Sequence, residues 1–132
     1  MAERKGESTN INPAELAIES AQLMADLHCE NITVLDVHEL SQVTKYIVIG
    51  NGTSDRQMYS VAEDIADYGK DNGHPVFRSS HERSSNWIVI DFVDVIVHIF
   101  EPNTRAYYDL ESLWIDAVEI SWRRPQPTDT KS

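Results

Sequence analysis

Two stretches of the chain place their apolar residues at helical spacing. The first opens at Asn12, Pro13 and Glu15, where asparagine can cap a helix, proline suits its first turn and glutamate completes a capping box. Ser54 and Gln57 form a second capping box ahead of the other stretch. The two stripes are Leu16, Ser20, Leu23, Met24 and Leu27, then Met58, Val61, Ala62 and Ile65. We therefore predict two amphipathic helices.

Short runs rich in β-branched and aromatic residues predict strands. They span residues 32–37, 45–50, 75–78, 86–92 and 94–100. The last run is apolar on both faces, which is typical of a central strand covered on both sides. Pro102 should end it, and a final helix should follow. One face of that helix carries Tyr107, Leu110, Trp114 and Ala117.

This order of elements, α-β-β-α-β-β-β-α, predicts an α/β fold in which helices flank a mixed β-sheet. At 132 residues the chain has the size of one domain. We expect that domain to cover residues 12–120, with flexible polar ends at 1–11 and 123–132. The N-terminus has no apolar run typical of a signal peptide, and no stretch approaches the ~20 apolar residues of a membrane span. These features favour a soluble cytoplasmic protein without a membrane partner.

The two runs at 86–92 and 94–100 are close enough to form a β-hairpin. If Phe92 and Val93 are its loop residues, Asp91 lies opposite Asp94 and Trp87 lies opposite His98. Residues two apart in a strand share a face. We therefore predict one patch that contains Trp87, Asp91, Asp94 and His98.

This patch is a poor candidate for catalysis or for a metal site. Asp94 and His98 are four residues apart on a strand, about 13 Å along the chain, which is too far for one ion. His98 has no evident nucleophilic partner, and Cys29 is best interpreted as a small buried hydrophobe. The loop GNGTSD before the second helix has no phosphate-binding lysine, so it only weakly indicates a nucleotide site. We predict no catalytic residues, no metal and no cofactor.

The charge of the chain limits its partners. Twenty-two acidic residues against eleven basic ones give a net charge of −11. Such a field repels a phosphate backbone, so we expect no direct sequence-specific contact with nucleic acid. A basic protein is the complementary partner. The charge alone is also explained by solubility, and that alternative stays open.

Three segments resemble the ribosomal silencing factor family, also called RsfS or Iojap. They are GTSDRQ at 52–57, WIVIDFxDVIVHIF at 87–100 and RxYYDLExLW at 105–114. The resemblance extends from about Leu16 to Ala117. It implies a nucleotidyltransferase-like fold without catalytic activity. It also implies binding to the large ribosomal subunit through ribosomal protein L-fourteen, a block on subunit joining and repression of translation when nutrients are short.

The candidate residues follow from residue type, because Trp87 and Tyr108 can anchor an interface and the carboxylates can pair with a basic partner. The candidate partner-binding residues are Trp87, Asp91, Asp94, His98, Arg105 and Tyr108. Trp87 could instead pack on the sheet, and Trp114 is expected in the core. The chain departs from the family pattern at Lys45, Ser80, His81 and Val93. A homodimer is compatible with the sequence, and a metal-dependent nucleotidyl- or phosphoryl-transferase is the alternative function.

Overall fold

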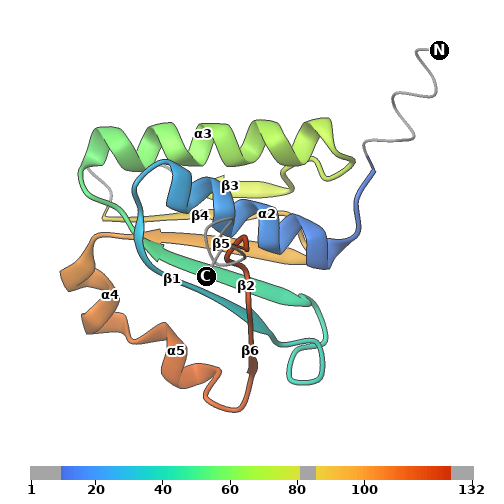
Figure 1. Cartoon of the computed structure of the whole chain (residues 1–132). Coiled ribbons are helices and arrows are strands. Elements are labelled where there is room, and N and C mark those ends of the chain that lie inside the picture. Colours follow the sequence, from blue (N-terminus) through green and yellow to red (C-terminus); the bar gives the residue numbers. More distant parts are fainter. Residues whose placement is uncertain (1–9, 81–85, 126–132) are drawn as a thin grey trace, which may run out of the picture.

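The computed structural model describes residues 10–80 and 86–125, which form a six-stranded sheet with helices on both faces (Figure 1). The strand order is β3-β4-β5-β2-β1-β6. β2 and β5 are parallel and the other neighbours are antiparallel, which confirms the predicted mixed sheet. The strands are β1 (Glu30–Asp36), β2 (Tyr46–Asn51), β3 (Arg78–Ser80), β4 (Trp87–Asp91), β5 (Val95–Phe100) and β6 (Val118–Ile120).

The helices α2 (Pro13–Asp26) and α3 (Asp55–Asp71) lie together on one face of the sheet (Figure 1). α2 begins with the predicted capping box, because Asn12 and Glu15 exchange side chain-to-backbone hydrogen bonds. At α3 only half of the predicted box forms. The Ser54 hydroxyl accepts from the Gln57 backbone N–H, but Gln57 Oε1 accepts from Thr53 and its amide donates to the Leu27 carbonyl. Gln57 therefore ties α3 to the end of α2.

Two cores lie on opposite faces of the sheet. The larger core lies beneath α2 and α3 and includes Val97 and Ile99 of β5. The smaller core lies on the other face, where Phe100 packs with residues of β1 and β2. It is covered by Leu110, Trp114 and Ala117. β5 therefore contributes to both cores, as its apolar pattern predicted, and Trp114 packs against a core.

The C-terminal region differs most from the predicted elements. The expected last helix is two short helices, α4 (Pro102–Tyr108) and α5 (Leu110–Leu113), because Asp109 between them has a left-handed φ of 50°. Tyr107, expected on the packed face, is 81% exposed. β6 was not predicted; it pairs with β1 at the edge of the sheet. The predicted strand at 75–78 lies three residues further on, as β3.

Residues beyond the predicted domain limits also pack against the fold. Trp122 is buried in the larger core, and its indole N–H donates to the Ile32 carbonyl. Ile11 donates its backbone N–H to the Asn72 carbonyl. Among the departures from the family pattern, Lys45 and Ser80 are exposed, so they change the surface rather than the core. His81, like residues 1–9 and 126–132 of the expected flexible ends, lies outside the described residues.

The register of the β4–β5 hairpin is two residues away from the predicted one. Trp87 lies opposite Phe100, and Asp91 lies opposite Ile96, so four residues connect the paired positions. The predicted two-residue loop was wrong because Phe92 is only 5% exposed and belongs to the larger core. A shift of two residues preserves the faces of a strand. Trp87, Asp91 and His98 therefore share a face, although their predicted pairing was wrong.

Val93, at the tip of this hairpin, adopts a φ of 77°. A β-branched residue is strained in this region, by roughly 1–2 kcal/mol. Val93 is 41% exposed, so little packing is lost on its removal. We expect Val93→Gly to raise the free energy of unfolding by about 0.5–1 kcal/mol after the greater flexibility of unfolded glycine is counted. Val93→Ala retains the Cβ and is the control for urea unfolding; equal stability of the two variants would contradict the strain.

Candidate partner-binding site

Trp87 is at the start of β4, where it joins three aromatic rings from the sheet and α4. Its ring centroid is 4.8 Å from that of Phe100 and 4.8 Å from that of Tyr108. Its indole Nε1–H donates to Nδ1 of His98 at 3.0 Å. The structure therefore brings together Trp87, His98 and Tyr108, three of the six candidate residues. Trp87 is half-buried and fixed in orientation.

His98 supports this cluster from inside the protein. It is 8% exposed, and burial lowers the pKa of its imidazole to about 4, although the nearby carboxylate of Asp91 opposes the shift. The neutral ring accepts the Trp87 hydrogen bond at Nδ1 and therefore carries its proton on Nε2. His98, predicted as a contact residue, lies almost entirely below the surface. Its hydrogen bond fixes the orientation of the Trp87 indole.

The depressed pKa of His98 makes stability depend on pH. The unfolded chain binds a proton near pH 6.5 that the folded chain does not bind until about pH 4. The contribution of neutral His98 to the free energy of unfolding is thus complete above pH 6.5 and is lost as pH falls toward 4. Between pH 7 and 5 we expect the wild type to lose about 2 kcal/mol more unfolding free energy than His98→Asn, which offers Trp87 an acceptor that does not titrate. Parallel stability curves would contradict this assignment.

Asp91 and Asp94 lie at the other end of β4, away from Trp87. Asp91 Oδ1 accepts from the Val93 backbone N–H at 2.7 Å, and its other oxygen lies 3.8 Å from Nε of Arg78. Asp94 is in the connection, and its backbone carbonyl accepts from the N–H groups of Lys45 and Tyr46. Asp91 therefore stabilises the turn of the hairpin. In residues 10–80 and 86–125, no three His, Cys, Asp or Glu side chains are placed to hold a metal ion.

Arg105 of α4 points its guanidinium group into the protein. Nη1 donates to the Asn31 carbonyl at 2.6 Å and to Oδ1 of Asn51 at 2.9 Å. Nε and Nη2 both donate to Oε2 of Glu111, at 3.0 and 2.6 Å. With its side chain only 12% exposed, Arg105 joins α4 to β1, β2 and α5. Although the sequence assigned it to partner binding, its visible contacts are internal.

A surface hollow of about 610 Å³ lies beside Trp87, between the start of β4 and α4. Sequence reasoning missed most of its lining. Besides Trp87 and Tyr108, it is lined by Asn86, Glu101, Asn103, Thr104 and Tyr107. Glu101 Oε1 caps α4 by accepting from the backbone N–H and the hydroxyl of Thr104. The Glu101–Pro102 pair was the available signal, because a capping side chain followed by proline marks the start of a helix.

The other candidate chemistries have ordinary structural explanations. Cys29 is buried against the larger core, and burial raises the pKa of its thiol while a hydrogen bond from Gln57 partly opposes this. The loop before α3 packs closely against the side chain of Met58 in that helix, because a Cβ added to Gly52 would lie 2.1 Å from Met58 Cγ. Among the described helices, none is both long and apolar enough to cross a bilayer.

The sequence and the fold both match known proteins. The profile of the family described as "Ribosomal silencing factor during starvation", RsfS, matches residues 10–132. The ribosomal silencing factor of Bacillus subtilis is 38% identical over 92 residues, which cover 70% of this chain and 78% of that protein. The ribosomal silencing factor of Halalkalibacterium halodurans is 30% identical over 95 residues, which cover 72% of this chain and 81% of that protein. A crystal structure of a Chromobacterium violaceum protein superposes with a TM-score of 0.75 at 26% identity, covering 89% of this chain and 97% of that one. The chain therefore belongs to the ribosomal silencing factor family, whose name implies regulation of translation in association with the ribosome.

Proposed function

We propose that this protein binds the large ribosomal subunit in the cytoplasm through ribosomal protein L-fourteen, prevents the small subunit from joining and so represses translation when nutrients are short. The observation that carries the proposal is the family match, which spans residues 10–132 and so covers the whole described fold. The protein acts by occupying a surface and has no turnover.

The surface around Trp87 supports this proposal physically. Trp87 and Tyr108 are residue types that often anchor protein interfaces, and Tyr108 is 53% exposed. Val89, Asp91 and Ile96, on the same face of the sheet as Trp87, are half-buried rather than covered. We infer that the partner meets this face at the Trp87 end. The net charge of −11 favours a basic partner, such as a protein that itself binds ribosomal RNA.

The alternative of a metal-dependent nucleotidyl- or phosphoryl-transferase has no supporting observation in the part of the chain that the structure describes. The carboxylates of Asp91 and Asp94 are at a turn, and no described group of side chains is placed to hold the metal that such a reaction needs. The acidic surface would also repel a nucleotide phosphate.

Sedimentation with purified large subunits tests the proposal. The protein should migrate with free large subunits at low salt, and its association rate should fall as ionic strength rises, because salt at 0.15 M screens charges beyond about 8 Å. Migration of the protein alone at low salt would contradict ribosome binding. An association rate that does not change from low to high salt would show that electrostatic attraction does not drive binding, without contradicting binding itself.

A further inference from the structure

The hollow beside Trp87 has aromatic walls on the side of α4. Tyr107 is 81% exposed and Tyr108 is 53% exposed, and their rings meet edge to face at 87° with centroids 5.1 Å apart. Because the only indole donor of Trp87 is already bonded to His98, Trp87 presents carbon atoms to the hollow. These walls can take an apolar group or a cation that lies on an aromatic face.

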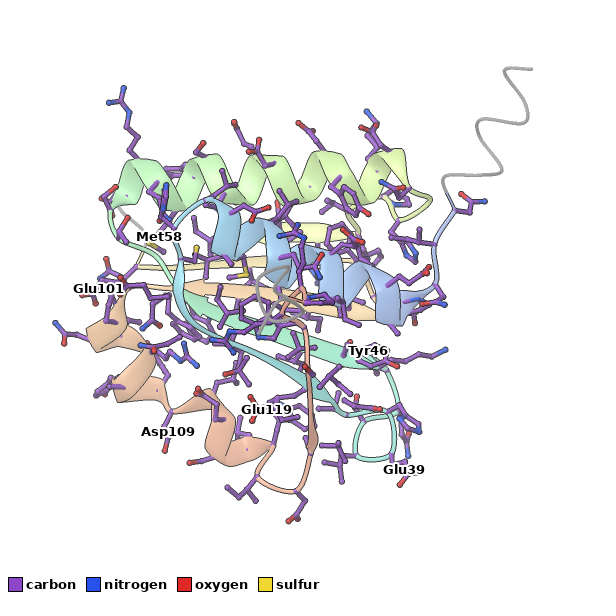
Figure 2. All side chains as sticks on the ribbon, in the orientation of Figure 1. Glu39, Tyr46, Met58, Glu101, Asp109 and Glu119 are labelled. Carbon is purple, nitrogen blue, oxygen red and sulfur yellow. The ribbon has the colours of Figure 1, made fainter. Side chains whose placement is uncertain are left out.

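The polar part of the hollow favours the cation. Glu101 lies at the edge of the hollow, at the start of α4 (Figure 2). Of its two carboxylate oxygens, only Oε1 accepts the capping hydrogen bonds from Thr104. Asn86 and Asn103 add amide groups, and the backbone N–H of Glu101 donates to the Asn86 carbonyl at 2.8 Å, which ties the two sides together. Among the described residues that line the hollow there is no lysine or arginine. The described lining of the hollow is therefore aromatic and acidic, within a chain of net charge −11.

We propose that the hollow is the seat of an arginine side chain of the partner, an inference that rests on the proposed binding to a basic ribosomal protein. A guanidinium group is planar, so it can lie against a tyrosine ring while its N–H groups donate to the Glu101 carboxylate and to amide oxygens. An aliphatic side chain would offer no donor to Oε2, the second carboxylate oxygen of Glu101. A phosphate would be repelled by it.

Two variants test the charge and the ring separately. Glu101→Gln keeps an oxygen that can cap α4 but removes the charge, and we expect it to weaken binding to large subunits by roughly tenfold. Tyr107→Leu keeps an apolar side chain on an exposed position, and the loss of the aromatic face should weaken binding by roughly threefold to fivefold. Asp64→Asn, on the exposed side of α3, changes the net charge equally and is the control. Glu101→Gln should also reduce the salt dependence of binding more than Asp64→Asn does.

A peptide titration separates this inference from the proposed function. The indole N–H resonance of Trp87, assigned by its loss in Trp87→Phe, is followed as acetyl-Gly-Arg-Gly-amide is added. We expect the resonance to shift with this peptide, to shift much less with the uncharged citrulline or leucine counterparts, and to respond weakly in Glu101→Gln. Equal shifts with all three peptides, or none, would overturn the arginine seat. If the wild type binds large subunits and the Glu101 and Tyr107 variants bind equally well, the arginine seat is wrong and the proposed function stands. If the peptide shifts are specific for arginine but the protein does not bind large subunits, the proposed function is wrong and the arginine seat stands.

Discussion

Replacing Trp87 with alanine is expected to weaken binding to large ribosomal subunits by thirtyfold or more and to destabilise the fold by about 3 kcal/mol. The binding loss corresponds to about 2 kcal/mol, the usual threshold for an interface hot spot. The stability loss follows from two ring contacts at 4.8 Å and one hydrogen bond to a buried histidine. The sequence offered these roles as alternatives. The half-buried position of Trp87 is compatible with both.

Trp114 is the matched control for Trp87. It is also half-buried and packs on the same face of the sheet, but it does not line the hollow. We expect Trp114→Ala to lower stability by a similar amount and to leave subunit binding within about twofold once both variants are measured well below their unfolding temperatures. Normal binding by a folded Trp87→Ala variant would remove this residue from the interface. Equal binding losses in both variants would show that only stability matters.

Arg105→Ala is expected to lower the free energy of unfolding by about 3 kcal/mol, because it breaks a partly buried ion pair with Glu111 and two further hydrogen bonds. Asn51, only 7% exposed, would then lose the donor that Arg105 provides. The loss should be greatest in α4 and α5, which Arg105 ties to the sheet. Urea unfolding measures the total, and amide hydrogen exchange should show faster exchange in these helices than in α3.

Two substitutions separate the geometry of Arg105 from its charge. Arg105→Lys keeps the charge, but a single ammonium group cannot replace the divergent contacts to Asn31, Asn51 and Glu111, so its stability should lie between those of the wild type and Arg105→Ala. Arg56→Ala removes the same charge from an exposed position on α3 and should change stability by less than about 0.5 kcal/mol. If the free energy of unfolding of Arg105→Ala is within about 0.5 kcal/mol of the wild-type value, Arg105 does not hold α4 and α5 on the sheet.

The elements with strong periodicity were predictable, and those set by tertiary contacts were not. The caps at Asn12 and Ser54 marked the starts of α2 and α3, and the apolar run of β5 indicated its central place in the sheet. β6 has only three residues, two of them exposed, so its pattern gave no signal. It forms because β1 offers an edge to pair with and Trp122 is buried just beyond it.

The same distinction applies to the candidate site. The alternation of strand residues correctly placed Trp87 and His98 on one face, because face depends only on parity. It could not show that Phe92 enters the core, and so the register and the position of Asp94 were wrong. Nor could it show that Arg105 turns inward, since its acceptors Asn31 and Asn51 are more than fifty residues away in sequence. The hollow depends on the angle between α4 and β4, which no local pattern specifies.

We propose that this protein prevents the two ribosomal subunits from joining. The most direct measurement is light scattering as purified small and large subunits are mixed, with the protein bound to the large subunits beforehand. We expect the joining signal to fall toward zero as the protein approaches one copy per large subunit, and we expect Trp87→Ala at the same concentrations to restore most of it. Undiminished joining when the large subunits are shown by sedimentation to carry the wild-type protein would contradict the claim.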